Sequence, residues 1–310
     1  MLIVFPGQGV QSVGMGKDVY DAFQSARDVF HEVDEAISQK LSTMIFQGTE
    51  EELKMTQNAQ PALMAVSIAL VRVLEREFGC DICSKASFFA GHSLGEYSAL
   101  CAAGVISLPD AAKILKIRGN SMTNAYPEGG AMAAIIGLDL EIAENIVSEC
   151  SNGQEIVQMA NDNSVGQVVI SGSATAVEMA MEKALSSNAK MVKLLEVSGP
   201  FHCKLMEKAL GPMIMALEKI DFRKPRRPII ANVTANAETS NFKELLLQQL
   251  VQRVRWRESL LFANANSVSC CLEIGAGKVL TGLAKRTVPH WKLTNINSPE
   301  SLEDFAKNYV

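Results

Sequence analysis

The ten residues FFAGHSLGEY at positions 88–97 restrict the possible fold of this chain more than any other segment. An apolar run, then Gly-x-Ser-x-Gly, then residues typical of a helix is the pattern of a nucleophile elbow. Because the chain must turn from a buried strand into a helix around Ser93, Gly91 and Gly95 must let the two elements approach closely. We predict that Ser93 is exposed at the end of a strand, with the Leu94 N–H placed to stabilise an oxyanion.

The composition excludes several classes of function. The chain has 310 residues, of which 48% are hydrophobic, so it can bury one large core or two. Its net charge of -5 and few aromatic residues disfavour nucleic-acid binding, and no apolar run is long enough to cross a membrane. The seven cysteines suggest reduced thiols and a cytoplasmic location, and the isolated pair Cys80 and Cys83 favours a loop over half a zinc site.

The first part of the chain reads as alternating strands and helices. The predicted segments are strands at 2–5 and 87–90, helices at 19–37, 61–78, 95–103 and 108–125, a capped helix start at 49–52 and a polar loop at 56–60. This alternation predicts an α/β fold with a parallel sheet.

The pattern changes between residues 126 and 197. Predicted strands at 132–136, 156–160, 168–171 and 191–197 and helices at 140–150 and 174–187 follow in the order βαββαβ. That order is typical of a ferredoxin-like unit. We therefore predict a small subdomain at 126–197, inserted into a core formed by residues 1–125 and 198–310.

The remaining segments return to the pattern of the first part. The prediction is helices at 202–219, 242–252, 256–265 and up to 286, strands at 229–233, 270–274 and 293–296, a basic loop at 221–228 and a helical tail from 298.

A serine nucleophile needs a base, and the chain has four histidines. His31 lies on a predicted surface helix. His92 precedes Ser93, and neighbouring residues of a strand point to opposite faces. Two histidines remain: His202 after a Gly-Pro turn, and His290 near the C-terminus.

The two histidines correspond to two functions. A serine hydrolase would use His290 with an acid such as Glu273, in the usual order of serine, acid and late histidine. The alternative pairs Ser93 with His202, whose second ring nitrogen would need a carbonyl oxygen because no acid is evident.

Gln8 and Arg118 are two further candidates. Gln8 lies in a glycine-rich turn after the first strand and belongs either to a plain loop or, through its amide or backbone, to the active site. Arg118 lies in a mostly apolar helix. It is either exposed to solvent or turned inward to bind a substrate carboxylate.

Six motifs together resemble one family. They are Phe5-Pro6-Gly7-Gln8-Gly9, Gly91-His92-Ser93-Leu94-Gly95-Glu96-Tyr97, Arg118-Gly119, Gly166-Gln167-Val168-Val169-Ile170-Ser171-Gly172, Pro200-Phe201-His202 and Gly275-Ala276-Gly277-Lys278-Val279-Leu280. Their order and spacing resemble the bacterial-type malonyl-CoA:acyl carrier protein transacylases of fatty-acid synthesis over nearly the whole chain. Gly-Ala-Gly at 275–277 and Lys116-Ile117 depart from the most familiar pattern, but neither removes a group that the chemistry needs.

The resemblance implies a fold and a set of roles. The fold is an α/β-hydrolase-like core interrupted by a ferredoxin-like subdomain. The implied catalytic residues are Ser93 (nucleophile), His202 (base), Gln8 and Leu94 (oxyanion hole) and Gln249, whose carbonyl orients the histidine. The implied substrate-binding residues are Arg118 (malonyl carboxylate), His92, Asn163 and Phe201, of which Phe201 disfavours branched acyl groups.

The implied reaction is ping-pong transfer of malonyl from malonyl-CoA, through malonyl-Ser93, to the phosphopantetheine thiol of acyl carrier protein. It needs no metal and no cofactor beyond coenzyme A as part of the substrate. We expect a cytoplasmic monomer. The acidic carrier protein should bind a basic face, for which the candidates are Lys190, Lys193, Arg253, Arg255, Lys285 and Arg286. A non-catalytic binding module is the third class considered, and intact Ser93, His202 and Arg118 argue against it.

Overall fold

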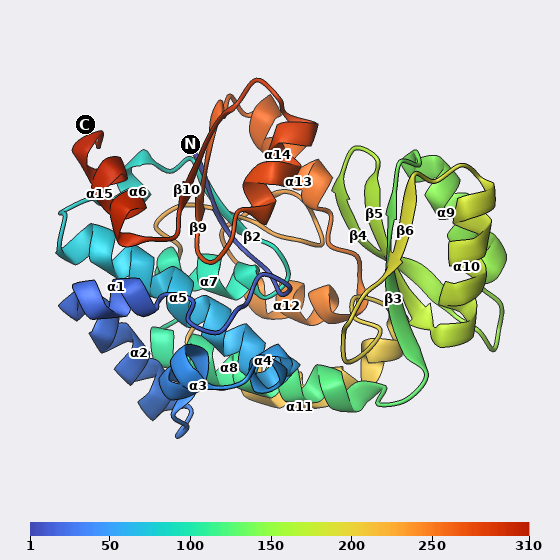
Figure 1. Cartoon of the computed structure of the whole chain (residues 1–310), viewed down its shortest axis with the longest axis horizontal. Helices are drawn as coiled ribbons and strands as arrows, with labels where there is room; N and C mark the ends of the chain where they lie inside the picture. Colours follow the sequence, from blue (N-terminus) through green and yellow to red (C-terminus); the bar gives the residue numbers. More distant parts are fainter. Residues whose placement is uncertain (310) are drawn as a thin grey trace.

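The computed structural model describes residues 1–309 and contains two sheets, flanked by helices (Figure 1). The larger sheet has the strand order β10-β9-β1-β2-β7-β8, and its strand pairs are parallel except for the antiparallel pair of β7 with β8. Its strands are β1 (Leu2–Phe5), β2 (Phe88–Gly91), β7 (Ile229–Ile230), β8 (Ala237–Glu238), β9 (Cys270–Ile274) and β10 (Lys292–Ile296).

Helices flank this sheet. They are α1 (Lys17–Ala22), α2 (Gln24–Ala36), α3 (Leu41–Gln47), α4 (Glu50–Lys54), α5 (Thr56–Arg76), α6 (Ile82–Lys85), α7 (Gly95–Ala102), α8 (Leu108–Ala125), α11 (Leu210–Leu217), α12 (Phe242–Val251), α13 (Trp256–Ala265), α14 (Val279–Thr287) and α15 (Pro299–Lys307), with the 3-10 helix η1 (Lys204–Ala209) before α11.

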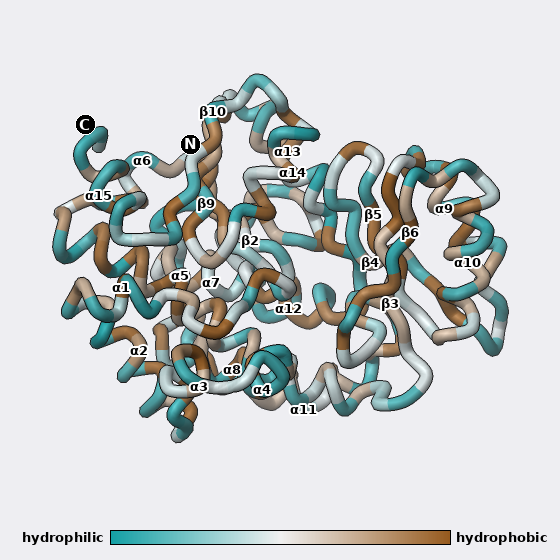
Figure 2. Tube along the Cα trace, viewed as in Figure 1, coloured by the Kyte–Doolittle hydropathy of each residue, from teal (hydrophilic) through white to brown (hydrophobic). Residues whose placement is uncertain are grey.

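The central strand and the long helix α5 form the core of this part. All four residues of β1 are fully buried, and most of α5 is buried as well, since it packs against α2, α7 and α8. Figure 2 shows hydrophobic stretches along the strands and a hydrophilic outer helix α15. The predicted α/β fold with a parallel sheet is therefore confirmed, and burial on both faces explains the nearly continuous apolar strands.

The second sheet has four antiparallel strands in the order β4-β5-β3-β6. Its elements are β3 (Gly130–Ile136), α9 (Leu140–Cys150), β4 (Val157–Ser164), β5 (Gln167–Ser173), α10 (Ala174–Ser186) and β6 (Met191–Leu194). This order of βαββαβ is ferredoxin-like, as predicted. All six elements fall within residues 126–197, while the exact subdomain boundaries stay a prediction.

The two sheets are joined beside β4. Backbone hydrogen bonds connect Val254 with Ala160 (2.8 Å) and with Asp162 (3.0 Å). The buried Asp162 carboxylate also pairs with Arg257 of α13, with 2.8 Å between Nη2 and Oδ2. These contacts hold the small sheet against the core close to Asn161 and Asn163.

The predicted polar loop at 56–60 is wrong, because these residues are the first turns of α5. Pro61 therefore lies inside the helix. The segment is polar because its side chains serve interior contacts: Gln60 is a partner of Arg118, and Thr56 bonds to Ser198.

Other predicted boundaries were also wrong. The helix expected at 19–37 is split, because Phe23 is extended between α1 and α2. The helix expected at 202–219 begins only at residue 204, because His202 has a φ of 59° that a helix does not allow. The strand expected at 229–233 pairs only at Ile229 and Ile230, and β8 was not predicted.

Two further predictions concern single motifs. The capped helix start at Thr49 is confirmed, since Thr49 and Glu52 form a reciprocal capping box at the start of α4. Cys80 and Cys83 are buried and all seven cysteines are free. Across residues 1–309, no helix has the length and apolar character to cross a membrane, and no cluster of three or more histidine, cysteine or acidic residues could hold a metal ion.

Candidate active site

The site is built around the tight connection between β2 and α7. Ser93 lies there with a φ of 53°, a strained conformation typical of functional positions. A Cβ atom on Gly91 would lie 1.9 Å from the Gly95 backbone, and one on Gly95 would lie 2.3 Å from the Phe5 carbonyl oxygen. Both glycines are therefore required for the close approach of strand and helix, as the motif predicts.

Ser93 contacts His202, which comes from the segment before η1. The distance between Ser93 Oγ and His202 Nε2 is 2.7 Å, and His202 Nδ1 lies 2.8 Å from the backbone oxygen of Gln249 on α12. A carbonyl thus accepts the Nδ1–H, which leaves Nε2 free to take the serine proton. The structure therefore contains the predicted Ser93–His202 pair, in which the partner of His202 Nδ1 is a backbone carbonyl and not a carboxylate.

His202 is neutral in the folded protein. Burial first, and then the positive charge of Arg118, lower the pKa of His202 to about 3. A neutral imidazole at physiological pH is the form that accepts a proton from Ser93.

Arg118 on α8 is buried, so the interpretation as a solvent-exposed arginine is wrong. Its Nη1 donates to Gln60 Oε1 (2.8 Å), and its Nη2 donates to Gln249 Oε1 (2.9 Å) and Ser93 Oγ (3.2 Å). The guanidinium also lies over the Tyr97 ring, 5.5 Å from its centre. Among residues 1–309, its hydrogen bonds go to neutral groups, and its buried Nε has no partner. The site therefore holds a desolvated cation that forms no ion pair with a carboxylate of residues 1–309.

Gln249 has a second contribution that the sequence analysis missed. Besides its backbone bond to His202, its side chain donates to Glu96 Oε2 (2.6 Å) and to the Ser93 carbonyl oxygen (3.0 Å). It thus connects the base, the nucleophile and Arg118. The side chain could not be assigned from a helix pattern, because its three partners are distant in the sequence.

Glu96 and Asn232 were also missed, although Glu96 is part of the elbow motif. Glu96 is buried and accepts hydrogen bonds from Gln249 and from the Asn232 backbone N–H (3.1 Å). Burial raises its pKa to about 7, against the opposing effect of these hydrogen bonds and of Arg118. Asn232 in turn accepts the Ser93 N–H (2.8 Å), which fixes the elbow from behind.

Gln8 and Leu94 are the two residues predicted to form an oxyanion hole. Gln8 lines the cavity and its Nε2 donates to Thr56 Oγ1 (3.3 Å). Leu94 immediately precedes α7, so its N–H lies at the positive end of that helix. The role of both residues in an oxyanion hole stays a prediction.

The small sheet contributes to the same site. His92 Nε2 lies 2.8 Å from Asn163 Oδ1, and the His92 ring contacts Trp256 edge-on. His92, Phe201 and Asn161 line the cavity, whereas Asn163 is not among the lining residues and holds His92 from behind. Asn161 was missed; it lies two residues before the asparagine that the resemblance indicated.

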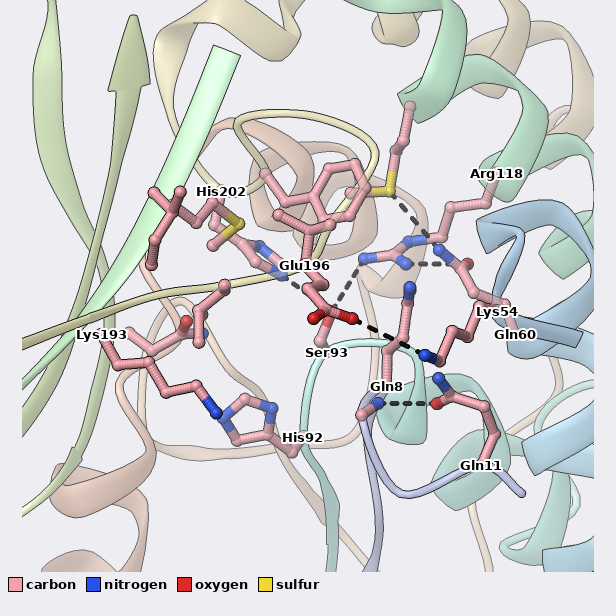
Figure 3. A pocket seen from close by; sticks show the side chains of 18 residues that line it. Gln8, Gln11, Lys54, Gln60, His92, Ser93, Arg118, Lys193, Glu196 and His202 are labelled. Atoms are coloured by element: carbon pink, nitrogen blue, oxygen red, sulfur yellow. Dashed lines mark hydrogen bonds and ion pairs between the residues drawn. The ribbon is translucent and has the colours of Figure 1, made fainter. Parts of the chain in front are cut away.

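These side chains surround a cavity of about 400 Å³. Ser93, His202 and Arg118 converge in it, as Figure 3 shows. Lys54, Lys193 and Glu196 also line it, together with the side chains of Gln11, Met122 and Met132.

The structure does not bring His290 and Glu273 to Ser93, as the serine hydrolase alternative would require. His290 is exposed and bonds to Asn264 (2.9 Å), while Glu273 accepts the N–H groups of Leu280 and Thr281 at the start of α14. Neither residue lines the cavity that contains Ser93. His31, as predicted from its helix, lies outside the site and contacts Tyr20.

Comparisons with known proteins cover nearly the whole chain. The acyl transferase domain family matches residues 2–307. The malonyl CoA-acyl carrier protein transacylase of Bacillus subtilis (strain 168) is 44% identical over 303 residues, which are 97% of this chain and 94% of the relative.

Two solved structures are similar throughout. The acyl-carrier-protein-S-malonyltransferase from Bartonella henselae has 48% identity and a TM-score of 0.96, covering 99% of this chain and 98% of that chain. A type II PKS acyl-carrier protein in complex with its malonyl-transacylase gives 42% identity and a TM-score of 0.94, with 99% of each chain covered. The likeness thus includes both sheets and the site between them.

Proposed function

The chain belongs to the acyl transferase family, and we propose that it transfers malonyl from malonyl-CoA to the phosphopantetheine thiol of acyl carrier protein. The matched relatives carry this activity in their names, and one similar structure is a malonyl-transacylase with its carrier protein. Such a reaction supplies the malonyl units that fatty-acid synthesis consumes.

The observation that supports this proposal most directly is the environment of Arg118. A buried guanidinium without a carboxylate partner, 3.2 Å from the nucleophile oxygen, suits a substrate whose acyl group ends in a carboxylate. Binding malonyl pairs the charge, whereas binding acetyl leaves it buried and unpaired, which costs several kcal/mol. Arg118 is thus the proposed source of selectivity for malonyl.

In the first half-reaction His202 Nε2 takes the Ser93 proton while Oγ attacks the thioester carbonyl. The Leu94 N–H and Gln8 stabilise the tetrahedral oxyanion, each by about 3 kcal/mol in barrier height. The carbon–sulfur bond then breaks, His202 returns the proton to the departing coenzyme A thiolate, and malonyl-Ser93 remains.

In the second half-reaction the carrier thiol gives its proton to His202 and attacks the malonyl-Ser93 ester. The ester bond breaks, and the serine oxygen recovers its proton from His202. This chain supplies the nucleophile, the base and the oxyanion donors, whereas coenzyme A and the carrier thiol enter with the two substrates.

Phe201 and His92 form part of the cavity wall. We propose that the buried Phe201 ring leaves little space beside the α-carbon of the acyl group, so malonyl is preferred to methylmalonyl. Asn163 supports this wall through its bond to His92.

The proposal includes a cytoplasmic monomer. All seven cysteines are free thiols, which is consistent with a reducing compartment. The monomeric state follows from the sequence analysis alone and needs a direct measurement of mass in solution.

Covalent labelling with radiolabelled malonyl-CoA, without carrier protein, tests the function. We expect stable label on the wild type and none on Ser93→Ala. His202→Ala should load far more slowly, and Arg118→Ala should lose malonyl loading on the order of 100-fold, since it removes one partner of a buried charge pair. Loading from acetyl-CoA serves as the control, because acetyl has no carboxylate to lose. Label on Ser93→Ala, or malonyl loading indifferent to Arg118, would contradict the proposal.

A further inference from the structure

An ion pair crosses the mouth of the active-site cavity. Lys54, the last residue of α4, and Glu196, in the segment after β6, both line the cavity, and 3.6 Å separate Lys54 Nζ from Glu196 Oε2. Figure 3 shows this pair across the cavity that contains Ser93 and Arg118. The pair thus bridges the core and the segment that leaves the small sheet.

The charges around the mouth are unequal. Among the described lining residues, Glu196 is the only acid, while Lys54, Lys193 and the deeper Arg118 are basic. Both side chains of the pair are largely exposed, at 55% for Lys54 and 91% for Glu196. Ion pairs so exposed to water are weak and exchange partners readily.

The substrates of the proposed function bring a second anion to this mouth, and the inference rests on that function. When the thioester lies at Ser93, the rest of the pantetheine arm must leave through the mouth. Coenzyme A and a carrier-bound arm both carry phosphate at the end of the arm opposite the sulfur. A phosphate that reaches the mouth meets Lys54 and competes directly with Glu196.

We propose that Lys54 binds a phosphate of the pantetheine-bearing substrate, and that Glu196 occupies Lys54 in the free enzyme and gives it up on binding. A phosphate offers more acceptor oxygens than a single carboxylate oxygen at 3.6 Å, and the compact ammonium of lysine suits it as a point charge. The capping box of Thr49 and Glu52 fixes the short helix α4, which positions Lys54 at the rim.

Kinetics with two malonyl thioesters separate this role from others. Malonyl-CoA carries phosphate, whereas malonyl-pantetheine presents the same acyl group and arm without it. We expect Lys54→Ala to lower kcat/KM for malonyl-CoA about fivefold, mainly through KM. Glu196→Gln, which frees Lys54 and removes a negative charge, should raise kcat/KM for malonyl-CoA. Neither variant should alter kcat/KM for malonyl-pantetheine.

A matched exposed pair provides the control. Lys17 and Asp21 form an ion pair on α1, outside the cavity, so Lys17→Ala and Asp21→Asn should leave both thioesters unaffected. Equal changes for both thioesters in Lys54→Ala, or no change for either, would overturn the proposal. A gain for both in Glu196→Gln would also overturn it, because the effect of Glu196 would then be general repulsion of the malonyl carboxylate that both thioesters carry. If the wild type takes malonyl from neither thioester, the proposed function itself fails.

Discussion

At the scale of single residues, the protonation of His202 depends on its burial and on the charge of Arg118. Both lower the pKa, to about 3, so the base stays neutral well below physiological pH. Malonyl bound to Arg118 would offset the second cause and make His202 a stronger base in the complex. The substrate carboxylate thereby contributes to reactivity as well as to binding.

This leads to a prediction for the pH dependence of Ser93 reactivity. Inactivation by a neutral serine-directed reagent such as a sulfonyl fluoride should stay nearly constant down to about pH 4 in the wild type. In Arg118→Gln the pKa of His202 should rise toward, but not reach, its ordinary value of 6.5, because burial remains the larger cause. The acid limb should therefore move to higher pH in the variant. A wild-type midpoint near pH 6.5 would contradict this account.

The buried carboxyl group of Glu96 should make the free energy of unfolding fall as the pH rises. Its pKa rises from 4.5 to about 7 on folding, so the folded state retains a proton that the unfolded chain releases. The stabilising contribution is complete below pH 4.5 and is lost as pH rises through 7. Urea unfolding of both proteins measures this loss. Between pH 4.5 and pH 8, the wild type should lose on the order of 3 kcal/mol of unfolding free energy relative to Glu96→Gln. If the unfolding free energies of the wild type and Glu96→Gln change with pH in parallel, the raised pKa of Glu96 is contradicted.

At the scale of elements, the strand–turn–helix connection of β2 and α7 leaves no space for a side chain. Gly95→Ala places a methyl group 2.3 Å from the Phe5 carbonyl oxygen, so β1 and α7 must separate. We expect a loss of more than about 4 kcal/mol in unfolding free energy, together with loss of labelling at Ser93. Thermal or urea unfolding measures the effect.

The control is a glycine in an open helical position. Gly282 of α14 has nothing within 4 Å of its added Cβ, so Gly282→Ala should stabilise the protein by up to about 1 kcal/mol through helix propensity. Wild-type stability in Gly95→Ala would show that the elbow can relax, contrary to the prediction.

Two of the errors in the element predictions have a common cause. Residues 56–60 were predicted as loop because they are polar, yet they form the start of α5 and face Arg118 and Ser198. Likewise, His202 interrupts a helical pattern because two distant partners hold it at a positive φ. At the active site, tertiary contacts decided what local periodicity could not.

At the scale of the whole molecule, the docking face for the carrier protein remains a prediction. Of the six candidates, Arg253 pairs with Glu144 (2.6 Å) and Arg255 with Glu258, so these two are already engaged. Lys193 lines the cavity, and Lys190 is exposed just before β6. Lys285 and Arg286 are exposed on α14, next to the small sheet that Arg286 contacts through Gln167.

Charge reversal tests this face. The double variant Lys285→Glu and Arg286→Glu should raise KM for the acidic carrier protein about tenfold and leave KM for malonyl-CoA unchanged. Lys307→Glu on α15 is the control, since it reverses one positive charge on another exposed helix. If the double variant retains the wild-type KM for the carrier, docking occurs elsewhere.

The nucleophile and the two sheets can be predicted from local sequence alone. The elbow glycines identify Ser93, because only glycine permits the close approach of strand and helix there. The βαββαβ order predicts the ferredoxin-like sheet, and the apolar strands predict a buried parallel one, because alternation and periodicity are properties of neighbouring residues.

Local patterns left His202 and His290, and both orientations of Arg118, open; the family resemblance implied His202 and an inward Arg118, and the tertiary structure brings His202 to Ser93 and buries Arg118. It also revealed the links of Gln249 to Glu96 and of Lys54 to Glu196. Each of these choices depends on side chains that are far apart in the chain, so their distances and desolvation arise only when the two sheets and their helices pack together.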